Sequence, residues 1–176
     1  MISKISKRDK KAFEDFYRAM ERPLYGFIFL KLNDSHQASD LLHDVFIEVW
    51  KGAGRFEGRS SVKTWVFGIA YRKVIDVYRR SGRVETMADV PEMADESPTA
   101  EETLVSSERA THVRACIEEL KPDHRVAIEL AFFEDFSYRQ ISDVVGSPEG
   151  TVKTRVYHAK KLLLRCVTAR LKLGVV

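Results

Sequence analysis

The sequence predicts an all-α protein in which a flexible acidic linker joins two small helical domains. Apolar residues recur at three- and four-residue spacing through most of the 176 residues, and no stretch alternates as a β-strand would. Residues 1–83 carry 17 lysines and arginines against 10 acidic residues, residues 84–110 carry one against eight, and residues 111–176 carry 11 against eight. This alternation is typical of two cationic modules on either side of an anionic connector. We therefore expect domains at 1–83 and 104–176, with the linker at 84–103.

Helical patterns cover most of residues 7–83. Pro23 predicts a break between a first and a second apolar segment, because proline removes a backbone donor and collides with the preceding turn. Asp34 with Gln37 predicts the cap of a third helix, which extends to about Trp50.

A loop with three glycines follows at 52–61, and apolar spacing then predicts a long helix over about 62–80. The aromatic residues beside the loop have two possible roles, core packing or stacking on nucleic-acid bases. For Trp50, Phe56 and Trp65 we favour core packing.

The second half of the chain resumes a helical pattern. We expect one helix over about 104–120 and another that begins at Pro122. Ser137 and Gln140 fit a capping box, which places the start of a further helix at Tyr138. Gly146 suits the left-handed residue that ends it.

Ser147 then caps a last helix that begins at Pro148. Segment 149–172 has a net charge of +6, and its apolar residues fall on one face. A helix-turn-helix presents its second helix to the major groove in this way, with cations for phosphates and base edges. An amphipathic hairpin with a solvated basic face is the simpler alternative. We favour DNA binding, because two caps, a turn glycine and a basic helix fall within one short stretch.

Several features limit the class of protein. No apolar run approaches the roughly 20 residues that span a bilayer, and the N-terminus lacks the apolar core of a secretory signal. Cys116 and Cys166 lie in helical patterns, and we expect them to be reduced. We accordingly expect a cytoplasmic protein without membrane insertion.

The whole chain resembles an extracytoplasmic-function (ECF) sigma factor, a minimal RNA polymerase specificity subunit of the sigma-70 family. The order and spacing of the matching segments, together with the acidic connector, make the resemblance specific. These segments are Ala38–Trp50, Arg55–Phe56, Ser60–Trp65, Ile69–Ala70, Val74–Arg80, Leu120–Pro122, Phe136–Tyr138, Ile141 and Gly150–Arg155.

The resemblance implies a sigma-2 domain at 1–83 and a sigma-4 domain at 104–176. It also implies a cytoplasmic protein of transcription initiation that binds core RNA polymerase, at the clamp helices of the largest subunit and at the flap region. Promoter DNA would be a second partner and an anti-sigma factor a third, with a role in a stress or envelope response. It implies no catalytic residue, metal or cofactor.

The resemblance assigns three sets of residues. Core polymerase would bind the third helix at Asp40, His43, Asp44, Phe46, Ile47 and Glu48. The −10 promoter element would be bound and melted by Arg55, Arg59, Ser60, Lys63, Tyr71, Arg72, Lys73, Arg79 and Arg80. The −35 element would be bound by Pro148, Glu149, Gly150, Thr151, Lys153, Thr154, Arg155, Tyr157, His158, Lys160 and Lys161.

The sequence departs from the family pattern at two positions. His43 stands where glutamine is common, and Asp135 stands where a turn glycine is common. Aspartate tolerates left-handed backbone angles, so we expect this turn to persist.

Other interpretations remain open. A metal could be gathered by His36, Asp40, His43 and Asp44, although a solvated polar face is commoner. The acidic connector could be a plain tether or a mimic of nucleic acid inside the polymerase. A conventional helix-turn-helix regulator is the main alternative function; an enzyme or a helical adaptor fits the motifs less well.

Overall fold

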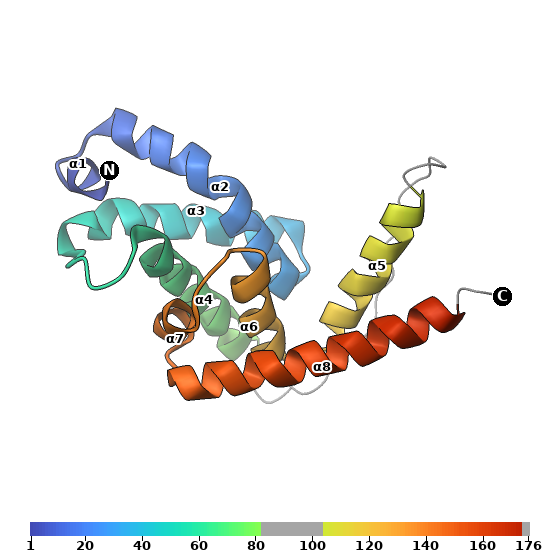
Figure 1. Cartoon of the computed structure of the whole chain (residues 1–176). Helices are drawn as coiled ribbons and strands as arrows, with labels where there is room; N and C mark the ends of the chain where they lie inside the picture. The colour runs from blue at the N-terminus through green and yellow to red at the C-terminus, as the bar shows by residue number, and fades with distance from the viewer. Residues whose placement is uncertain (82–103, 174–176) are drawn as a thin grey trace. The chain divides into compact units, whose positions relative to one another are not determined.

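In a computed structural model the protein is built from helices, and no strand occurs in residues 1–81 and 104–173, which the structure describes (Figure 1). The acidic connector predicted at 84–103 lies outside these residues. The helices are α1 (Ile2–Ser6), α2 (Lys10–Leu32), α3 (Ser35–Gly52), the 3₁₀-helix η1 (Ala53–Arg55), α4 (Val62–Arg80), α5 (Leu104–Glu118), α6 (Pro122–Phe132), α7 (Tyr138–Val145) and α8 (Glu149–Leu173).

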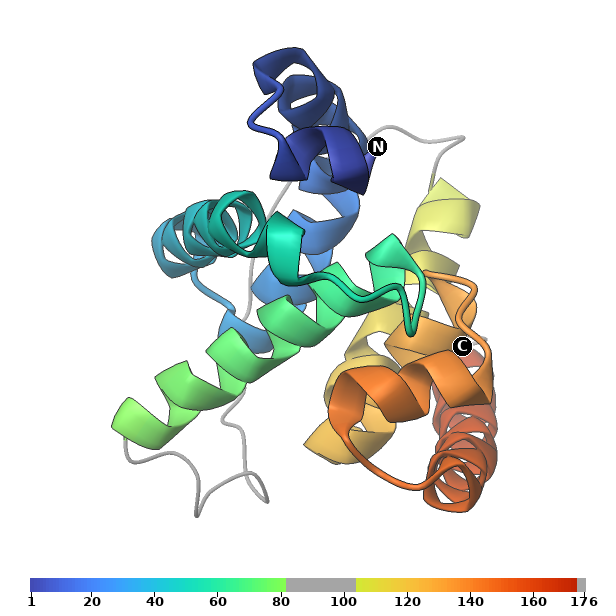
Figure 2. The same ribbon diagram turned by 90° about the vertical axis from the view of Figure 1, so that its left-hand side faces the viewer.

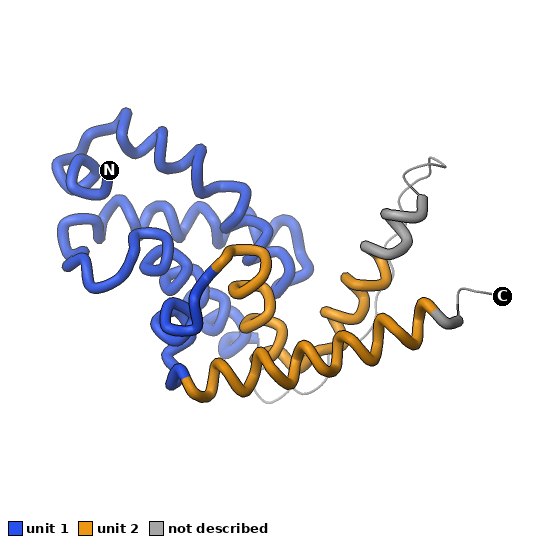
Figure 3. Tube along the Cα trace, in the orientation of Figure 1, with its two compact units in different colours: residues 1–84, 136–149 blue, residues 85–135, 150–176 orange. Residues whose placement is uncertain are grey.

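The chain forms two compact units (Figure 3). Unit 1 contains Met1–Val84 with Phe136–Glu149, and unit 2 contains Glu85–Asp135 with Gly150–Val176. We assigned residues 136–149 to a C-terminal domain from the sequence, whereas here they pack with the N-terminal segment. The domain boundaries at 1–83 and 104–176 therefore stay a prediction.

The core of unit 1 lies where α2, α3 and α4 pack together (Figures 1 and 2). Large side chains from all three helices are fully buried, and the rings of Phe27 and Phe67 meet edge to face with centroids 5.1 Å apart. Burial of each such side chain stabilises the fold by about 1.5–3 kcal/mol. The largest of them are Phe16, Leu24, Ile28, Val45, Val49, Val66, Phe67 and Ile69.

The predicted break at Pro23 is wrong, because α2 continues through this residue from Lys10 to Leu32. Proline costs one intrahelical hydrogen bond. The helix persists because Met20 and Leu24, on either side of Pro23, are both buried in the same core. Tertiary packing thus outweighs the local preference of proline.

The predicted starts of α3 and α4 are confirmed. Asp34 accepts a hydrogen bond from the Gln37 amide at 3.0 Å and caps α3, and this bond lowers the pKa of the Asp34 carboxyl. Ser61 accepts a hydrogen bond from the Thr64 amide at 3.0 Å and caps α4. A side-chain cap of this kind stabilises a helix by about 1 kcal/mol.

Helix α7 packs against α4 in unit 1. The rings of Phe67 and Phe136 meet edge to face, with centroids 5.2 Å apart. The predicted capping box is confirmed: the Ser137 hydroxyl accepts from the Gln140 amide, and the Gln140 side chain accepts from the Ser137 amide. Gly146 ends the helix in the left-handed region, at φ 68°.

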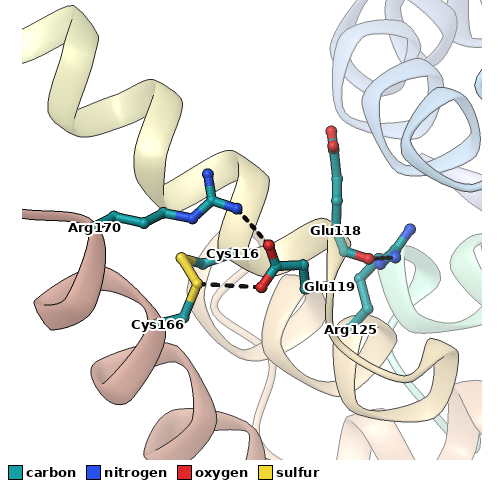
Figure 4. A network of polar contacts seen from close by, with 6 residues as sticks. All are labelled: Cys116, Glu118, Glu119, Arg125, Cys166 and Arg170. Carbon is teal, nitrogen blue, oxygen red and sulfur yellow. Dashed lines mark hydrogen bonds and ion pairs between the residues drawn. A yellow bond between two sulfur atoms is a disulfide. The ribbon is translucent and has the colours of Figure 1, made fainter. Parts of the chain in front are cut away.

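In unit 2, a disulfide joins α5 to α8 (Figure 4). Cys116 and Cys166 have Cα atoms 5.8 Å apart, although 50 residues separate them in the sequence. Beside the disulfide, the Arg170 guanidinium forms an ion pair with Glu119. The prediction of two reduced cysteines is wrong, because two helix faces distant in sequence bring the sulfur atoms together.

We expect reduction of this disulfide to lower the free energy of unfolding by about 2–4 kcal/mol. The bond closes a loop of about 50 residues and so restricts the unfolded chain. Urea unfolding with and without dithiothreitol measures the effect. The double variant Cys116→Ser with Cys166→Ser is the control and should not respond to dithiothreitol. Identical unfolding midpoints for the oxidised and reduced protein would contradict the expectation.

Asp135 has a left-handed backbone, at φ 55°. The turn that glycine commonly occupies is therefore kept here by aspartate, as expected from the tolerance of this residue. Helix α8 begins at Glu149, one residue later than predicted, a difference within the usual uncertainty of helix ends.

Candidate nucleic-acid interface

The outer face of α3 is acidic and exposed. Asp40, His43 and Asp44 all have exposed side chains, and Ile47 is 37% exposed. Phe46, which we expected to contact a partner, is only 2% exposed, and its ring packs against those of Phe13, Phe16 and Tyr17. Of the two apolar candidates on this helix, only Ile47 offers its side chain to a partner.

No group of three or more His, Cys, Asp or Glu side chains is arranged to hold a metal ion within the described parts of the chain. The candidate set His36, Asp40, His43 and Asp44 lies on exposed helix surface.

The loop between α3 and α4 begins with η1 and turns at Gly58, whose φ of 71° favours glycine. Its two arginines, Arg55 and Arg59, are both exposed, and Arg59 lies 2.5 Å from the Glu57 carboxylate. An ion pair this exposed contributes little to stability. Both arginines can therefore reach a phosphate at low cost.

A small open hollow of about 180 Å³ lies at the base of this loop. Its walls come from the end of α3, from η1 and from the first half of α4. They present a carboxylate, two guanidinium groups and an indole ring, from Glu48, Gly52, Arg55, Trp65, Ile69 and Arg72.

The three aromatic residues near the loop differ in their surroundings. Trp50 packs on Phe13, with ring centroids 4.9 Å apart, in agreement with core packing. Trp65 packs on Phe56, with ring centroids 5.1 Å apart, and unlike Trp50 it also lines the hollow, although both tryptophans are partly buried. Trp65 therefore combines packing with an accessible ring.

Several cationic side chains of α4 form ion pairs or lie over aromatic rings, which the sequence alone did not indicate. Lys73 forms an ion pair with Glu48 at 3.1 Å, which joins a residue predicted for DNA to one predicted for polymerase. Lys63 lies over the Phe136 ring, 5.1 Å from its centroid. Arg79 pairs with Asp76 at 3.8 Å on an exposed surface.

The remaining predicted −10 residues are accessible to different degrees. Arg72 and Arg80 are exposed, while Ser60 and Tyr71 are partly buried. Arg72, Arg79 and Arg80 extend the cationic surface from the hollow, which Arg72 lines, to the end of α4.

In unit 2, α8 exposes a row of polar and cationic side chains. Thr151, Lys153, Thr154, Tyr157, His158, Lys160 and Lys161 are all exposed, as are Pro148, Glu149 and Gly150 at its start. Val152, Val156 and Ala159 are buried, which confirms the predicted apolar face at these three positions. Leu163 is only partly buried.

Arg155 differs from the other predicted −35 residues. Its guanidinium pairs with the Asp123 carboxylate on α6 at 2.5 Å, and its side chain is only 25% exposed. The neighbouring His124 is partly buried, and burial lowers its pKa, as do the nearby charges of His158 and Arg155. Arg155 thus connects α8 to α6. The helical spacing of the sequence places Arg155 on the outer side of α8 and could not reveal this contact.

No helix among the described residues is long and apolar enough to span a membrane. A capping-box helix followed in sequence by the cationic helix α8, together with a separate basic surface on α4, is typical of a helical DNA-binding protein.

Comparison with known proteins identifies the family. A family model for sigma-70 region 2 matches residues 16–84, and one for sigma-70 region 4 matches residues 112–163. The chain belongs to the sigma-70 family, in its ECF group: it is a sigma factor. Sigma factors bind core RNA polymerase and direct it to promoters, and they are not enzymes. The conventional helix-turn-helix regulator is not favoured.

Similar curated proteins are ECF and related sigma factors. The ECF RNA polymerase sigma factor SigX of Bacillus subtilis is 29% identical over 160 residues, covering 88% of this chain and 82% of its own. The RNA polymerase sigma-H factor of Pseudomonas aeruginosa is 29% identical over 173 residues, covering 93% of this chain and 90% of its own.

Solved structures share the fold. Sigma factor RpoE from Bartonella quintana, in complex with the anti-sigma factor NepR, has a TM-score of 0.69 at 24% identity, covering 88% of this chain and 98% of that one. CnrH, in complex with the cytosolic domain of CnrY, has a TM-score of 0.70 at 17% identity, and the match covers 96% of this chain and 95% of the CnrH chain.

Proposed function

We propose that this sigma factor acts in the cytoplasm and divides promoter-specific initiation among three surfaces. The outer face of α3 binds core RNA polymerase. The Gly52–Ser61 loop with α4 binds and opens the −10 element, and α8 binds the −35 element. The observation that carries the proposal is the match of both sigma-70 regions, in order, in one chain. A regulator that binds DNA by itself would need only the second.

The α3 face suits a basic partner surface such as the clamp helices of the polymerase. Asp40 and Asp44 are exposed one helical turn apart, so that both carboxylates point the same way. Ile47 adds an exposed apolar side chain one turn further on. Charges of this kind set the register and association rate of a complex, while the apolar side chain is excluded from water on docking.

The hollow beneath the loop suits an extruded base. Extrusion of a base from the stack costs a few kcal/mol, and a pocket that holds the base offsets this cost. Trp65 supplies an aromatic face, and Arg55 and Arg72 supply cations at the rim of the same hollow. A protein that captures one unstacked base in this way favours separated strands at the −10 element.

Helix α8 suits the major groove of the −35 element. The side chains near its start, among them Lys153 and Thr154, would meet base edges, and Lys160 and Lys161 further along would meet phosphates. Because Asp123 holds the Arg155 guanidinium, we assign Arg155 to the orientation of α8 as well as to DNA contact.

We further propose that an anti-sigma factor regulates this protein and that it acts in a stress or envelope response. Two structural neighbours, RpoE and CnrH, were solved in complex with NepR and with the cytosolic domain of CnrY, respectively. We also retain the flap region of the polymerase as a second contact.

The assignment of the α3 face is tested with Asp40→Ala combined with Asp44→Ala. We expect the affinity for core polymerase to fall about tenfold or more, since two charges that would meet basic partner groups are lost. Titration of labelled full-length protein with core polymerase gives the affinity.

A charge-matched control is Asp15→Ala combined with Asp143→Ala, which removes two exposed acidic residues from α2 and α7. This control should bind polymerase as the original protein does. Equal affinities for the two double variants would show that the polymerase binds elsewhere.

A further inference from the structure

We propose that α1 and Arg8 form an N-terminal brace that positions the Gly52–Ser61 loop for promoter opening. The proposal rests on the proposed role of this loop at the −10 element. The brace residues precede residue 16, where the match to sigma-70 region 2 begins. They therefore lie outside the matched region.

Helix α1 contacts η1, the first turn of the loop, and also contacts α3 and α2 (Figures 1 and 2). Ile5 is completely buried, although α1 has only five residues, and Ile2, one turn earlier, is partly buried. A helix this short has little stability of its own, so it owes its place to this packing. One face of η1 is thereby covered by protein.

Arg8 fixes the chain between α1 and α2. Its backbone is left-handed, at φ 66°, a conformation that costs a non-glycine residue about 1–2 kcal/mol. Such strain persists only where the surroundings impose it. The conformation lets α1 fold back on α3 and brings the Arg8 side chain to the last turn of that helix.

The Arg8 guanidinium makes two contacts there. It donates a hydrogen bond to the Trp50 carbonyl oxygen at 2.9 Å, and its central carbon lies 5.2 Å from the centroid of the Trp50 ring. The last carbonyls of a helix lack intrahelical partners, and a cation is favourable beside them. Arg8 therefore holds the end of α3, two residues before Gly52.

These contacts converge on the base of the loop. Gly52 is buried, and a Cβ added to it would lie 3.6 Å from the Trp65 ring in the hollow. Because Gly52 and Arg55 line the hollow, a shift of the α3 end or of η1 would change its shape. Arg8 is not among the residues that line the hollow, so it is a positioning residue.

The test compares Arg8→Ala, Arg8→Lys and the neighbouring Lys7→Ala, which removes an exposed cation without touching Trp50. Each full-length variant is assembled with core polymerase. Permanganate reactivity measures opening on a promoter with the preferred −10 element and on one with a substituted base at the extruded position. Titration measures the affinity for polymerase.

We expect Arg8→Ala to lower opening of the preferred promoter about tenfold, because a charged hydrogen bond that aligns the loop is lost. We also expect the ratio of opening between the preferred and substituted promoters to fall, while polymerase affinity stays within about twofold. Lysine keeps the positive charge but lacks the planar guanidinium group, so promoter opening by Arg8→Lys should lie between that of the original protein and that of Arg8→Ala. Lys7→Ala should match the original protein.

A purely structural role would lower opening of both promoters by one factor and leave their ratio unchanged. That result overturns the brace, as does normal opening by Arg8→Ala. Exchange of loop residues 55–60 for a glycine–serine sequence, measured in parallel, distinguishes the role of the loop in opening from the role of the brace in positioning the loop. Normal opening by the loop-exchange variant overturns the role of the loop and of the brace together. Blocked opening by that variant, with an unchanged ratio in Arg8→Ala, overturns the brace alone.

Discussion

Exchange of residues 55–60 for a glycine–serine sequence of equal length is expected to block promoter opening while polymerase binding persists. The exchange removes Arg55 and Arg59 and the ring of Phe56, which packs on Trp65. Without these groups an extruded base is no longer held, and the few kcal/mol of unstacking are not offset. Ser61 is retained because it caps α4. Permanganate reactivity of unpaired thymines near the start site measures opening, which we expect to fall at least tenfold.

A matched control is Ser61→Ala, which removes the α4 cap at the last position of the loop and leaves the exchanged residues 55–60 intact. Loss of this cap costs about 1 kcal/mol of stability. We expect this variant to open promoters normally well below its unfolding temperature. If the loop exchange opened promoters as well as Ser61→Ala does, the loop would be a passive connection between α3 and α4.

The second large effect is expected on α8, where Lys153→Ala should change which −35 elements are used. A cation paired to a guanine discriminates against other bases by about 1–3 kcal/mol. Lys153 is exposed close to the start of the helix, where side chains reach base edges. Transcription from a promoter library should therefore show a changed base preference at one position, by about fivefold or more.

Lys161→Ala is the matched control on the same helix. A phosphate contact acts nearly equally on all sequences, so this variant should weaken every promoter and reduce the salt slope by about one. Base recognition by α8 is wrongly assigned if both variants lower all promoters by the same factor.

The ion pair between Arg155 and Asp123 gives a separate expectation. If the pair orients α8, then Arg155→Ala and Asp123→Ala should weaken promoter use alike, and their combination should cost little more than either alone. A double-mutant cycle on −35 binding measures this coupling. Additive losses would show that Arg155 acts on DNA independently of Asp123.

Local features of the fold were predictable from the sequence. The capping box at Ser137 and Gln140 and the helix over Val62–Arg80 follow from contacts between residues a few positions apart. The left-handed Gly146 is of the same kind. Such signals are complete within a short window, because a helix end is set by its own backbone and side chains.

Contacts between distant segments were not predictable. The disulfide between Cys116 and Cys166 and the pair of Lys73 with Glu48 join helices whose relative register no periodicity specifies. Helix α1 was missed because its five residues are too few to show a repeating apolar pattern, and Ile5 is its single buried residue. Phe46 was placed on the surface of α3 for a related reason, since only the packing of α2 shows which faces of α3 are covered.

Run-off transcription with purified core polymerase on a promoter library is the decisive test of whether this chain is a promoter-specific initiation factor. We expect transcripts that depend on this chain and whose start sites share two upstream elements, at −35 and −10. Transcripts should be lost with the Asp40→Ala and Asp44→Ala double variant at limiting polymerase. If no transcript depended on this chain, and the chain left a footprint on promoter DNA without polymerase, it would instead be a conventional helix-turn-helix regulator.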